Sequence, residues 1–364
     1  MLRYIGKRLL QMIPILLVVA ILIFTLMYFV PGDPVKIILG NDATEVDIAR
    51  VKQELGLNEP YIIQLTNYLK NLLRLDFGKS FFSGLAVKDE LVLRFPNTLI
   101  LTVMCVSFSI IVGIPIGISC AMRADKLTDR VWLFLTLLCN SMPGFWLALM
   151  LVLLFSRQLG WLPSSGVGSA KYFILPVLAN SLGALAGIAR QTRASMLEVI
   201  RADFISTAKS KGISRREVIW KHALPNALIP IITVIGGSFG MMLGGATITE
   251  SIFSIPGIGL YMMSGINNRD YPVVRGCILY IAFMFAVMML LTDLVYAFVD
   301  PRIKAQYVRA KKQPEKAEKK SEEGSENSQC FPETRRSPFP CSRPPYPCGT
   351  AWSALFPALL LCSW

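Results

Sequence analysis

The sequence contains little charge and few of the side chains from which catalytic and metal sites are built. Only 17% of its 364 residues are charged, 53% are hydrophobic, and the mean hydropathy is +0.51. This composition is typical of a membrane protein rather than a soluble domain. The chain has one histidine, His222, which cannot form a metal cluster alone, and none of its eight cysteines lies in a C-x-x-C pair. Neither a zinc site nor a redox motif is therefore predicted.

A phosphate-binding loop is also missing. Gly78-Lys79-Ser80 has the ending of a P-loop, but Leu73 occupies the position of the glycine that must stand five residues before Gly78. ATP can therefore supply energy only through another polypeptide. The sequence shows no nucleophile–base pair, carboxylate dyad or metal-ligand set, so we predict a protein that is not an enzyme and has no catalytic or metal-binding residues.

Basic residues exceed acidic ones and give a formal net charge of +13. Loops on the cytoplasmic side of a membrane protein are enriched in Lys and Arg, and this chain also has a basic tail. These two features explain the charge without a nucleic-acid partner, and none is predicted.

Six apolar runs predict six transmembrane helices and an all-α polytopic membrane protein. The runs cover approximately residues 9–30, 99–121, 131–155, 172–189, 227–249 and 276–299. Arg3, Lys7 and Arg8 precede the first run, which is longer than the apolar core of a signal peptide. We therefore expect a retained helix with a cytoplasmic N-terminus, and six crossings return the C-terminus to the cytoplasm.

The predicted organisation has four parts. Residues 1–30 form the N-terminal transmembrane helix, and residues 31–96 form an external region with amphipathic helices near 44–55 and 60–75. Residues 97–304 form a five-span core. Residues 305–364 are a disordered or aberrant tail, because 311–327 is a charged low-complexity run and the Pro- and Cys-rich end is too short to span a bilayer. A misjoined end and a peripheral membrane segment both fit that tail.

The stretch 193–225 is strongly basic and lies between two apolar runs, which predicts a structured cytoplasmic loop of two helices. The first helix runs from about Arg193 to a left-handed glycine C-cap at Gly212. Its spacing places one set of apolar side chains on a common face: Met196, Ile200, Phe204 and Ala208. We expect Ala208 on the surface that docks a partner, because a small side chain permits close approach.

The second helix of this loop begins with Ser214-Arg215-Arg216-Glu217. A serine three residues before a glutamate predicts a capping box, in which each side chain accepts a hydrogen bond from the other residue's backbone N–H. Pro225 limits how far the helix extends without distortion.

These residues follow the spacing of a known cytoplasmic loop, written E-A-A, three residues, G, nine residues, I, one residue, L-P. Ser206-Thr207-Ala208 fills the first positions, Gly212 the glycine, His222 the isoleucine position and Leu224-Pro225 the end, so Glu, the first Ala and Ile are replaced. This loop resembles that of the permease subunits of binding-protein-dependent ABC importers. The longer string Thr192–Gly212 is similar to the dipeptide, oligopeptide and nickel branch, and the resemblance covers about Met1–Lys304.

The resemblance implies a transport subunit in the plasma (inner) membrane of a prokaryote, which imports peptides or a related solute such as glutathione or nickel. It implies a second permease subunit, two ATP-binding cassette subunits that hold ATP and Mg, and an extracytoplasmic solute-binding protein. No cofactor is expected in this chain. The residues of the ATPase-coupling loop would be Asp203, Ala208, Gly212, Ser214, Glu217, Leu224 and Pro225.

Polar groups inside the apolar runs predict either a translocation path or helix packing. Glu250 and Asp293 lie at membrane depth, where a carboxylate faces protein or a water-filled cavity. Either residue can hold helices together or line the path. Gly240 and Gly244 belong to a stripe of small residues that fits close packing within the subunit or an interface that lines the path.

A further interruption lies in the third run, where Asn140 and Ser141 precede Pro143 and predict a kink. The residues assigned to the path or its gate are therefore Asn140, Ser141, Gly240, Gly244, Glu250 and Asp293. The alternative functions are an ion-gradient-driven secondary transporter and an intramembrane enzyme. The first needs paired carboxylates or an internal repeat and the second a catalytic constellation, none of which is evident in the sequence.

Overall fold

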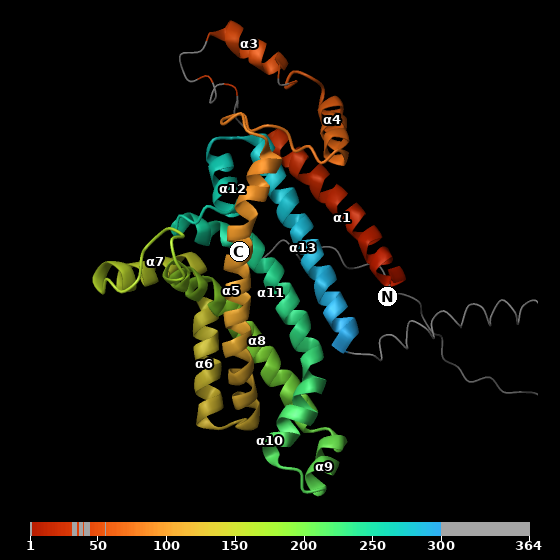
Figure 1. Ribbon diagram of the computed structural model, residues 1–364, viewed down its shortest axis with the longest axis vertical. Helices are drawn as coiled ribbons and strands as arrows, with labels where there is room; N and C mark the ends of the chain where they lie inside the picture. The colour runs from red at the N-terminus through yellow and green to blue at the C-terminus, as the bar shows by residue number, and fades with distance from the viewer. Residues whose placement is uncertain (1, 31–34, 36–38, 40–43, 55, 300–364) are drawn as a thin grey trace, which may run out of the picture. The chain divides into compact units, whose positions relative to one another are not determined.

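The structure is a computed structural model that describes residues 2–30, 35, 39, 44–54 and 56–299 (Figure 1). Every element named within these ranges is helical, which confirms the predicted all-α class. The helices are α1 Leu2–Phe29, α3 Glu45–Glu54, α4 Tyr61–Leu73, α5 Val87–Met122, α6 Leu127–Ser141, α7 Gly144–Leu151, the π-helix η1 Val152–Gln158, α8 Lys171–Ile200, α9 Asp203–Ser210, α10 Arg215–Glu217, the π-helix η2 Val218–Ala223, α11 Leu224–Ile252, α12 Ile258–Asn267 and α13 Tyr271–Val299.

Five helical segments are long and apolar enough to cross a membrane. They are Arg8–Phe29, Val87–Met122, Lys171–Ile200, Arg215–Gly244 and Tyr271–Val295. A sixth crossing is possible only if α6 and the α7–η1 pair count together as one broken span. The described residues therefore form five crossings, or six if the broken pair is one span. The predicted tail at 305–364 lies outside the described residues.

The third predicted span is broken rather than kinked. Its two halves, Leu127–Ser141 and Gly144–Gln158, meet at an angle of 97°. Met142 and Pro143 both have extended backbone, with ψ angles of 128° and 130°. A residue before proline is disfavoured in the helical region, and proline offers no N–H to continue the helix. Two successive extended residues redirect the chain, whereas a single proline inside a helix only bends it.

The centre of the fold is the pair α5 and α8, with α11 beside α8 and α13 between α11 and α1. Glycine brings α5 and α8 together, because a methyl group at Gly113 would lie 3.1 Å from the carbonyl oxygen of Leu185. Buried apolar side chains from α5, α8 and α11 form one cluster, which includes Leu101, Leu175 and Met242. Van der Waals packing of such side chains holds the three helices together, because within a bilayer lipid tails are as apolar as the side chains.

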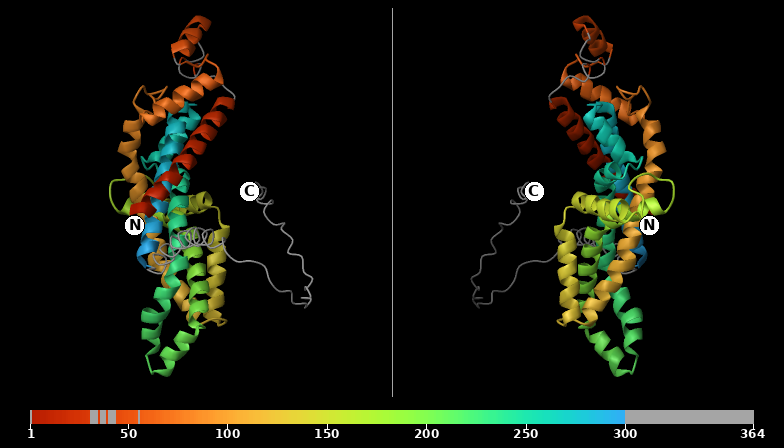
Figure 2. Two further views of the ribbon diagram at one scale, coloured as in Figure 1. Left: turned by 90° about the vertical axis from the view of Figure 1, so that its right-hand side faces the viewer. Right: turned by 90° about the vertical axis from the view of Figure 1, so that its left-hand side faces the viewer.

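The two ends of the helical core carry different elements. The α9–α10 loop lies at one end, and α4 and α12 lie at the other, with α3 beyond α4 (Figures 1 and 2). Helices α3 and α4 confirm the two amphipathic helices expected near 44–55 and 60–75. Helix α12 was not expected, since the sequence predicted no helix between the apolar runs 227–249 and 276–299.

Candidate coupling loop and translocation residues

The first helix of the basic loop is shorter than the sequence predicts. Arg193 belongs to α8, which continues without interruption to Ile200, and α9 starts only at Asp203. Ala202 between them is extended, with φ −72° and ψ 147°. The predicted helix from Arg193 to Gly212 is therefore two helices, because one extended residue ends the first and changes the direction of the second.

The outward face of α9 also differs from the prediction. Ala208 is only 7% exposed and packs with Ile205 against Val218 and Ile219, whereas Phe204 is 48% exposed. Ile205 and Ala208 stand three residues apart and share one face of the helix. The small side chain of Ala208 lets α9 approach the second helix of its own loop. The expectation that Ala208 faces a partner is therefore wrong, and Phe204 is the exposed apolar group of this helix.

The turn after α9 has the geometry that the sequence predicts. Gly212 has φ +78°, and its N–H donates to the carbonyl of Lys209 at 3.0 Å. No atom lies within 4 Å of the position that a β-carbon would take. Glycine is needed here for its backbone conformation rather than for space.

The capping box forms in part. The hydroxyl of Ser214 accepts from the N–H of Glu217 at 3.3 Å. The carboxylate of Glu217 accepts instead from the ammonium of Lys221 at 2.5 Å, one turn further along. The reciprocal half of the predicted box is thus replaced by an i,i+4 ion pair on an exposed face.

The second helix of the loop does not end at Leu224-Pro225. Helix α10, η2 and α11 follow one another without a break, so Arg215 and Ile252 lie on one continuous helix. Pro225 lies in the first turn of α11, directly after the π-helical segment. Proline has no N–H for the bond to the preceding turn, and a local π-helical widening accommodates such a gap.

Two contacts attach this end of the molecule to the core. The guanidinium of Arg215 donates to the carbonyl of Met122 at the end of α5, at 3.3 Å. Arg193 on α8 binds both carboxylate oxygens of Asp129 on α6, at 2.8 and 2.6 Å. The backbone N–H of Asp125 donates to the same carboxylate at 3.0 Å. The Asp129 side chain is 1% exposed, so the pair is a buried clamp between α6 and α8.

Sequence reasoning overlooked this clamp. The signal in the sequence was an acid just before one apolar run and an arginine just after the next, 64 residues apart.

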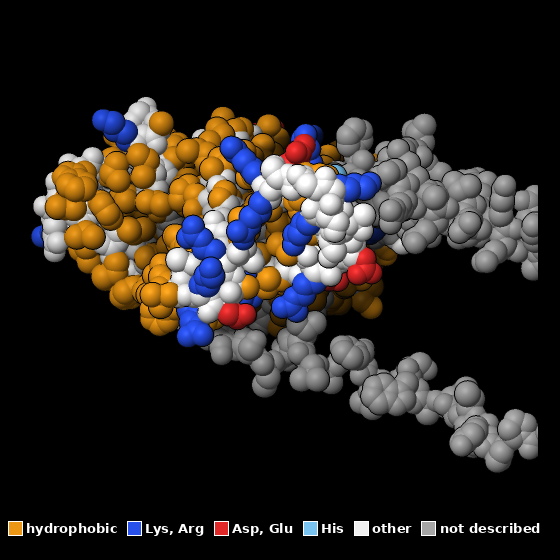
Figure 3. Space-filling view, turned by 90° about the horizontal axis from the view of Figure 1, so that it is seen from below, with side chains coloured by type: hydrophobic (Ala, Val, Ile, Leu, Met, Phe, Trp, Pro, Cys, Tyr) orange, Lys and Arg blue, Asp and Glu red, His pale blue; other side chains and the backbone are white. Residues whose placement is uncertain are grey.

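Basic side chains surround this loop. Figure 3 shows Lys and Arg gathered on the face at the α9–α10 end. The exposed basic residues of the α5–α6 turn and the loop are Arg123, Lys126, Arg130, Arg201, Lys209, Lys211, Arg215, Arg216 and Lys221. Such a concentration marks a surface for acidic partner groups or a cytoplasmic membrane face.

Glu250 lies at the opposite end, entirely within protein, as one reading of the sequence expected. Its side chain is 0% exposed and accepts from the Thr98 hydroxyl at 2.7 Å and from the N–H of Leu260 at 3.1 Å. Thr98 in turn accepts from the N–H of Ile258 at 2.9 Å. A methyl group at Gly257 would overlap the carboxylate. Glu250 therefore fastens the turn between α11 and α12 to α5.

Gly240, Gly244 and Asp293 border one cavity of about 940 Å³ between α1, α11 and α13. Asp293 pairs with Arg8 of α1 at 3.3 Å. A methyl group at Gly240 would overlap the ring of Phe285, so this glycine permits close packing of α11 and α13.

The remaining two predicted path residues lie elsewhere. Asn140 and Ser141 are exposed at the break after α6, and the Ser141 hydroxyl donates to the carbonyl of Leu137 at 2.8 Å. The structure thus divides the six residues into a cavity group, the buried Glu250 and an exposed pair.

A helical chain with several apolar crossings and a structured basic loop is a multi-pass membrane protein. Residues 113–305 match the family model "Binding-protein-dependent transport system inner membrane component", and residues 1–102 match the model of its N-terminal part. The chain therefore belongs to this family. This confirms the resemblance seen in the sequence and a multi-pass location in the inner membrane.

The chain matches curated relatives over nearly the whole length of those relatives. The chain is 41% identical over 332 residues to the dipeptide transport system permease protein DppB of Alkalihalophilus pseudofirmus, covering 84% of this chain and 100% of the relative. It is 39% identical over 304 residues to the glutathione transport system permease protein GsiC of Salmonella typhi, covering 84% and 99%. A solved structure of the inward-facing MetNI methionine ABC transporter aligns with 58% of this chain and 96% of its own, at 18% identity and a TM-score of 0.49.

Proposed function

We propose that this permease subunit imports short peptides. The match to DppB and GsiC over 84% of the chain carries the proposal, since the substrates in both names, a dipeptide and glutathione, are short peptides. A peptide-sized solute therefore has more support than nickel. Neither relative's name refers to a solute carried by an ion gradient, so the secondary-transporter alternative has no support.

The energy for transport would come from two ATP-binding cassette subunits, which hold ATP and Mg outside this chain. A second permease subunit and an extracytoplasmic solute-binding protein complete the proposed assembly. The basic α9–α10 end supports a cytoplasmic site for the ATPase subunits, because Lys and Arg are concentrated in cytoplasmic loops. The opposite end, with α4 and α12, would then face the binding protein, and both chain termini would lie in the cytoplasm.

The loop would act as a rigid coupling element. Ile205 and Ala208 pack α9 against η2, so a displacement of α9 moves η2 and α11 with it. Phe204 is the exposed apolar side chain of α9 and supports a contact with a groove on an ATPase subunit. Closure of the ATPase subunits would push this element and rock the helices around a central path, which is an alternating-access cycle.

Uptake into proteoliposomes tests this function. The permease pair, the ATPase subunits encoded with it and the binding protein are reconstituted, and entry of a radiolabelled dipeptide is followed with and without internal ATP. We expect uptake that needs both ATP and the binding protein and that unlabelled peptide, but not nickel, suppresses. Uptake driven by an ion gradient without the ATPase subunits would overturn the proposal.

The docking surface is tested separately by Phe204→Asp. We expect the ATPase subunits to be lost on purification, since a charge replaces the exposed apolar contact. Trp220→Asp on η2 is the matched control, because Trp220 is also exposed but borders a groove toward α5 rather than the outer face of α9. Retention of the ATPase subunits by the Phe204 variant would exclude α9 as the docking helix.

A further inference from the structure

Arg275, at the α4–α12 end, has no carboxylate partner among the described residues. Arg275 lies in the first turns of α13, and its Nε–H donates to the carbonyl of Tyr271 at 3.2 Å. Across the described ranges, no hydrogen bond or ion pair uses the remaining guanidinium N–H groups of Arg275. The guanidinium is instead packed against two aromatic rings, at 5.1 Å from the centroid of Phe24 and 5.4 Å from that of Tyr68. Aromatic faces compensate only part of the cost of a desolvated cation.

The neighbouring groups do not supply the missing charge. Asp270 interacts electrostatically with Arg275, but no ion pair joins the two, and its carboxylate accepts from the Ser80 hydroxyl and from the N–H of Phe81. Burial raises the pKa of the Tyr68 hydroxyl, so this group stays neutral beside Arg275. The Tyr68 hydroxyl is itself buried with no hydrogen-bond partner among the described residues. The guanidinium of Arg275 and the hydroxyl of Tyr68 are thus neighbouring hydrogen-bond donors without an acceptor for all their hydrogens among the described residues. Both would be satisfied by a group that accepts hydrogen bonds.

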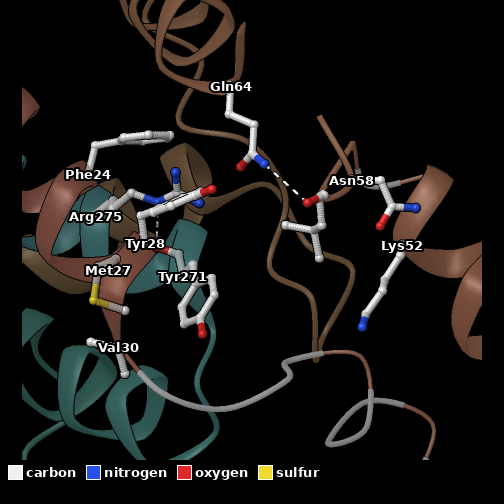
Figure 4. Close-up of a pocket in the computed structure, with 10 residues that line it drawn as sticks. Phe24, Met27, Tyr28, Val30, Lys52, Asn58, Gln64, Tyr271 and Arg275 are labelled. Atoms are coloured by element: carbon white, nitrogen blue, oxygen red, sulfur yellow. Dashed lines mark hydrogen bonds between the residues drawn. The ribbon is translucent and has the colours of Figure 1, made fainter. Parts of the chain in front are cut away.

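Arg275 borders a cavity of about 290 Å³ between the end of α1, the α3–α4 connection and the start of α13. Figure 4 shows Arg275 with Phe24 and Tyr28 on one side of the cavity and Lys52 and Asn58 on the other. Besides Arg275, two tyrosines and two amides border it, and the described part of its lining contains no Asp or Glu. This combination favours an anion, and the flat fork of a guanidinium matches a carboxylate in particular.

The size of the cavity limits what it holds. Binding pockets for whole small molecules range from about 300 to 1,000 Å³, so 290 Å³ suits a single side chain better than a complete peptide. One of its walls, from α3 to the start of α4, belongs to the region after α1 that the proposed orientation places outside the membrane, where the solute-binding protein docks.

We propose that this cavity receives the carboxylate of an Asp or Glu side chain from the solute-binding protein. The inference rests on the proposed function, because it needs an external binding protein. Arg275 holds the carboxylate through its Nη N–H groups, which have no other acceptor among the described residues. The contact orients the binding protein over the permease.

The test measures binding of the solute-binding protein to the complete complex in nanodiscs. Arg275→Gln is expected to weaken binding at least tenfold, because an ion pair that is removed from water is lost when one partner is truncated. ATP hydrolysis without the binding protein should not change, which shows that the complex is intact. Arg157→Gln is the matched control, since Arg157 is an exposed arginine at the end of η1 and away from the cavity. Equal affinities of wild type and Arg275→Gln would overturn the inference.

Double-mutant cycles identify the acid. Each exposed Asp and Glu of the binding protein is changed to its amide and measured against wild type and Arg275→Gln. One acid is expected whose loss weakens binding at least tenfold to wild type and has no effect on the variant. The result should be the same for peptide-free and peptide-loaded binding protein, and coupling seen only with the loaded form would assign the carboxylate to the peptide and overturn the inference.

Asp33 provides a second check, because it follows α1 closely in this chain. If Asp33→Asn abolishes the effect of Arg275→Gln, the carboxylate comes from this chain and the inference is overturned. A wild-type complex that binds no binding protein at all refutes the proposed function instead. The two failures are therefore distinguishable.

Discussion

Removal of Arg193 should be among the most destabilising single changes in this protein. Arg193→Ala leaves the Asp129 carboxylate, 1% exposed in the native structure, with the N–H of Asp125 as its remaining backbone donor among the described residues. Breaking a buried pair by removing one member costs about 3–5 kcal/mol, because the other charge stays buried. Arg193 is 23% exposed, so its removal admits some water to Asp129. We therefore expect the lower end, about 3 kcal/mol.

Denaturant titration of the purified subunit in detergent micelles measures this loss. The double variant Asp129→Ala/Arg193→Ala should be more stable than Arg193→Ala alone, because no uncompensated charge remains. Lys221→Ala is the control. It breaks the pair between Lys221 and Glu217, whose side chains are 71% and 41% exposed, and such an exposed pair should contribute little to stability. If Arg193→Ala is no more destabilising than Lys221→Ala, the buried clamp does not exist.

Three further outcomes are expected. Glu250→Ala should destabilise the subunit by about 2–4 kcal/mol, because it leaves the N–H of Leu260 unsatisfied and opens a void. Glu250→Gln should cost less. Equal unfolding midpoints for the Ala variant and wild type would contradict this network. Gly212→Val should destabilise the subunit by about 1–3 kcal/mol through backbone strain and should uncouple ATP hydrolysis from uptake. Gly212→Asn should have a smaller effect on both. Normal uptake by the valine variant would show that the turn geometry is unimportant. Truncation after Ala310 should leave insertion and uptake intact, because the tail has no periodic apolar face; failure of the truncated chain to assemble with its partners would give the tail a role.

The features that the sequence predicted correctly are governed by neighbouring residues. Apolar runs long enough to cross a bilayer became helices, and Gly212 and Ser214 end and begin helices as their local chemistry requires. These signals need only a few consecutive residues, because helix caps and turns satisfy nearby backbone groups.

The errors arise where distant residues decide the outcome. The inward orientation of Ala208 depends on Val218 and Ile219, which belong to a separate helix. Glu250 could be recognised as unusual, but its partner Thr98 lies 152 residues away and nothing in the sequence joins the two. The break at Pro143 was located correctly, whereas its angle of 97° depends on how α7 packs on α8.

The continuous helix from Arg215 to Ile252 joins the basic loop directly to the opposite end of the subunit. At 1.5 Å per residue it is roughly 57 Å long, so a tilt of about 5° displaces one tip by roughly 5 Å relative to the other. Glu250, near its far tip, is fastened to α5 and to the α11–α12 turn. A tilt of this helix imposed at the basic loop would therefore also move α5 and α12 at the opposite end.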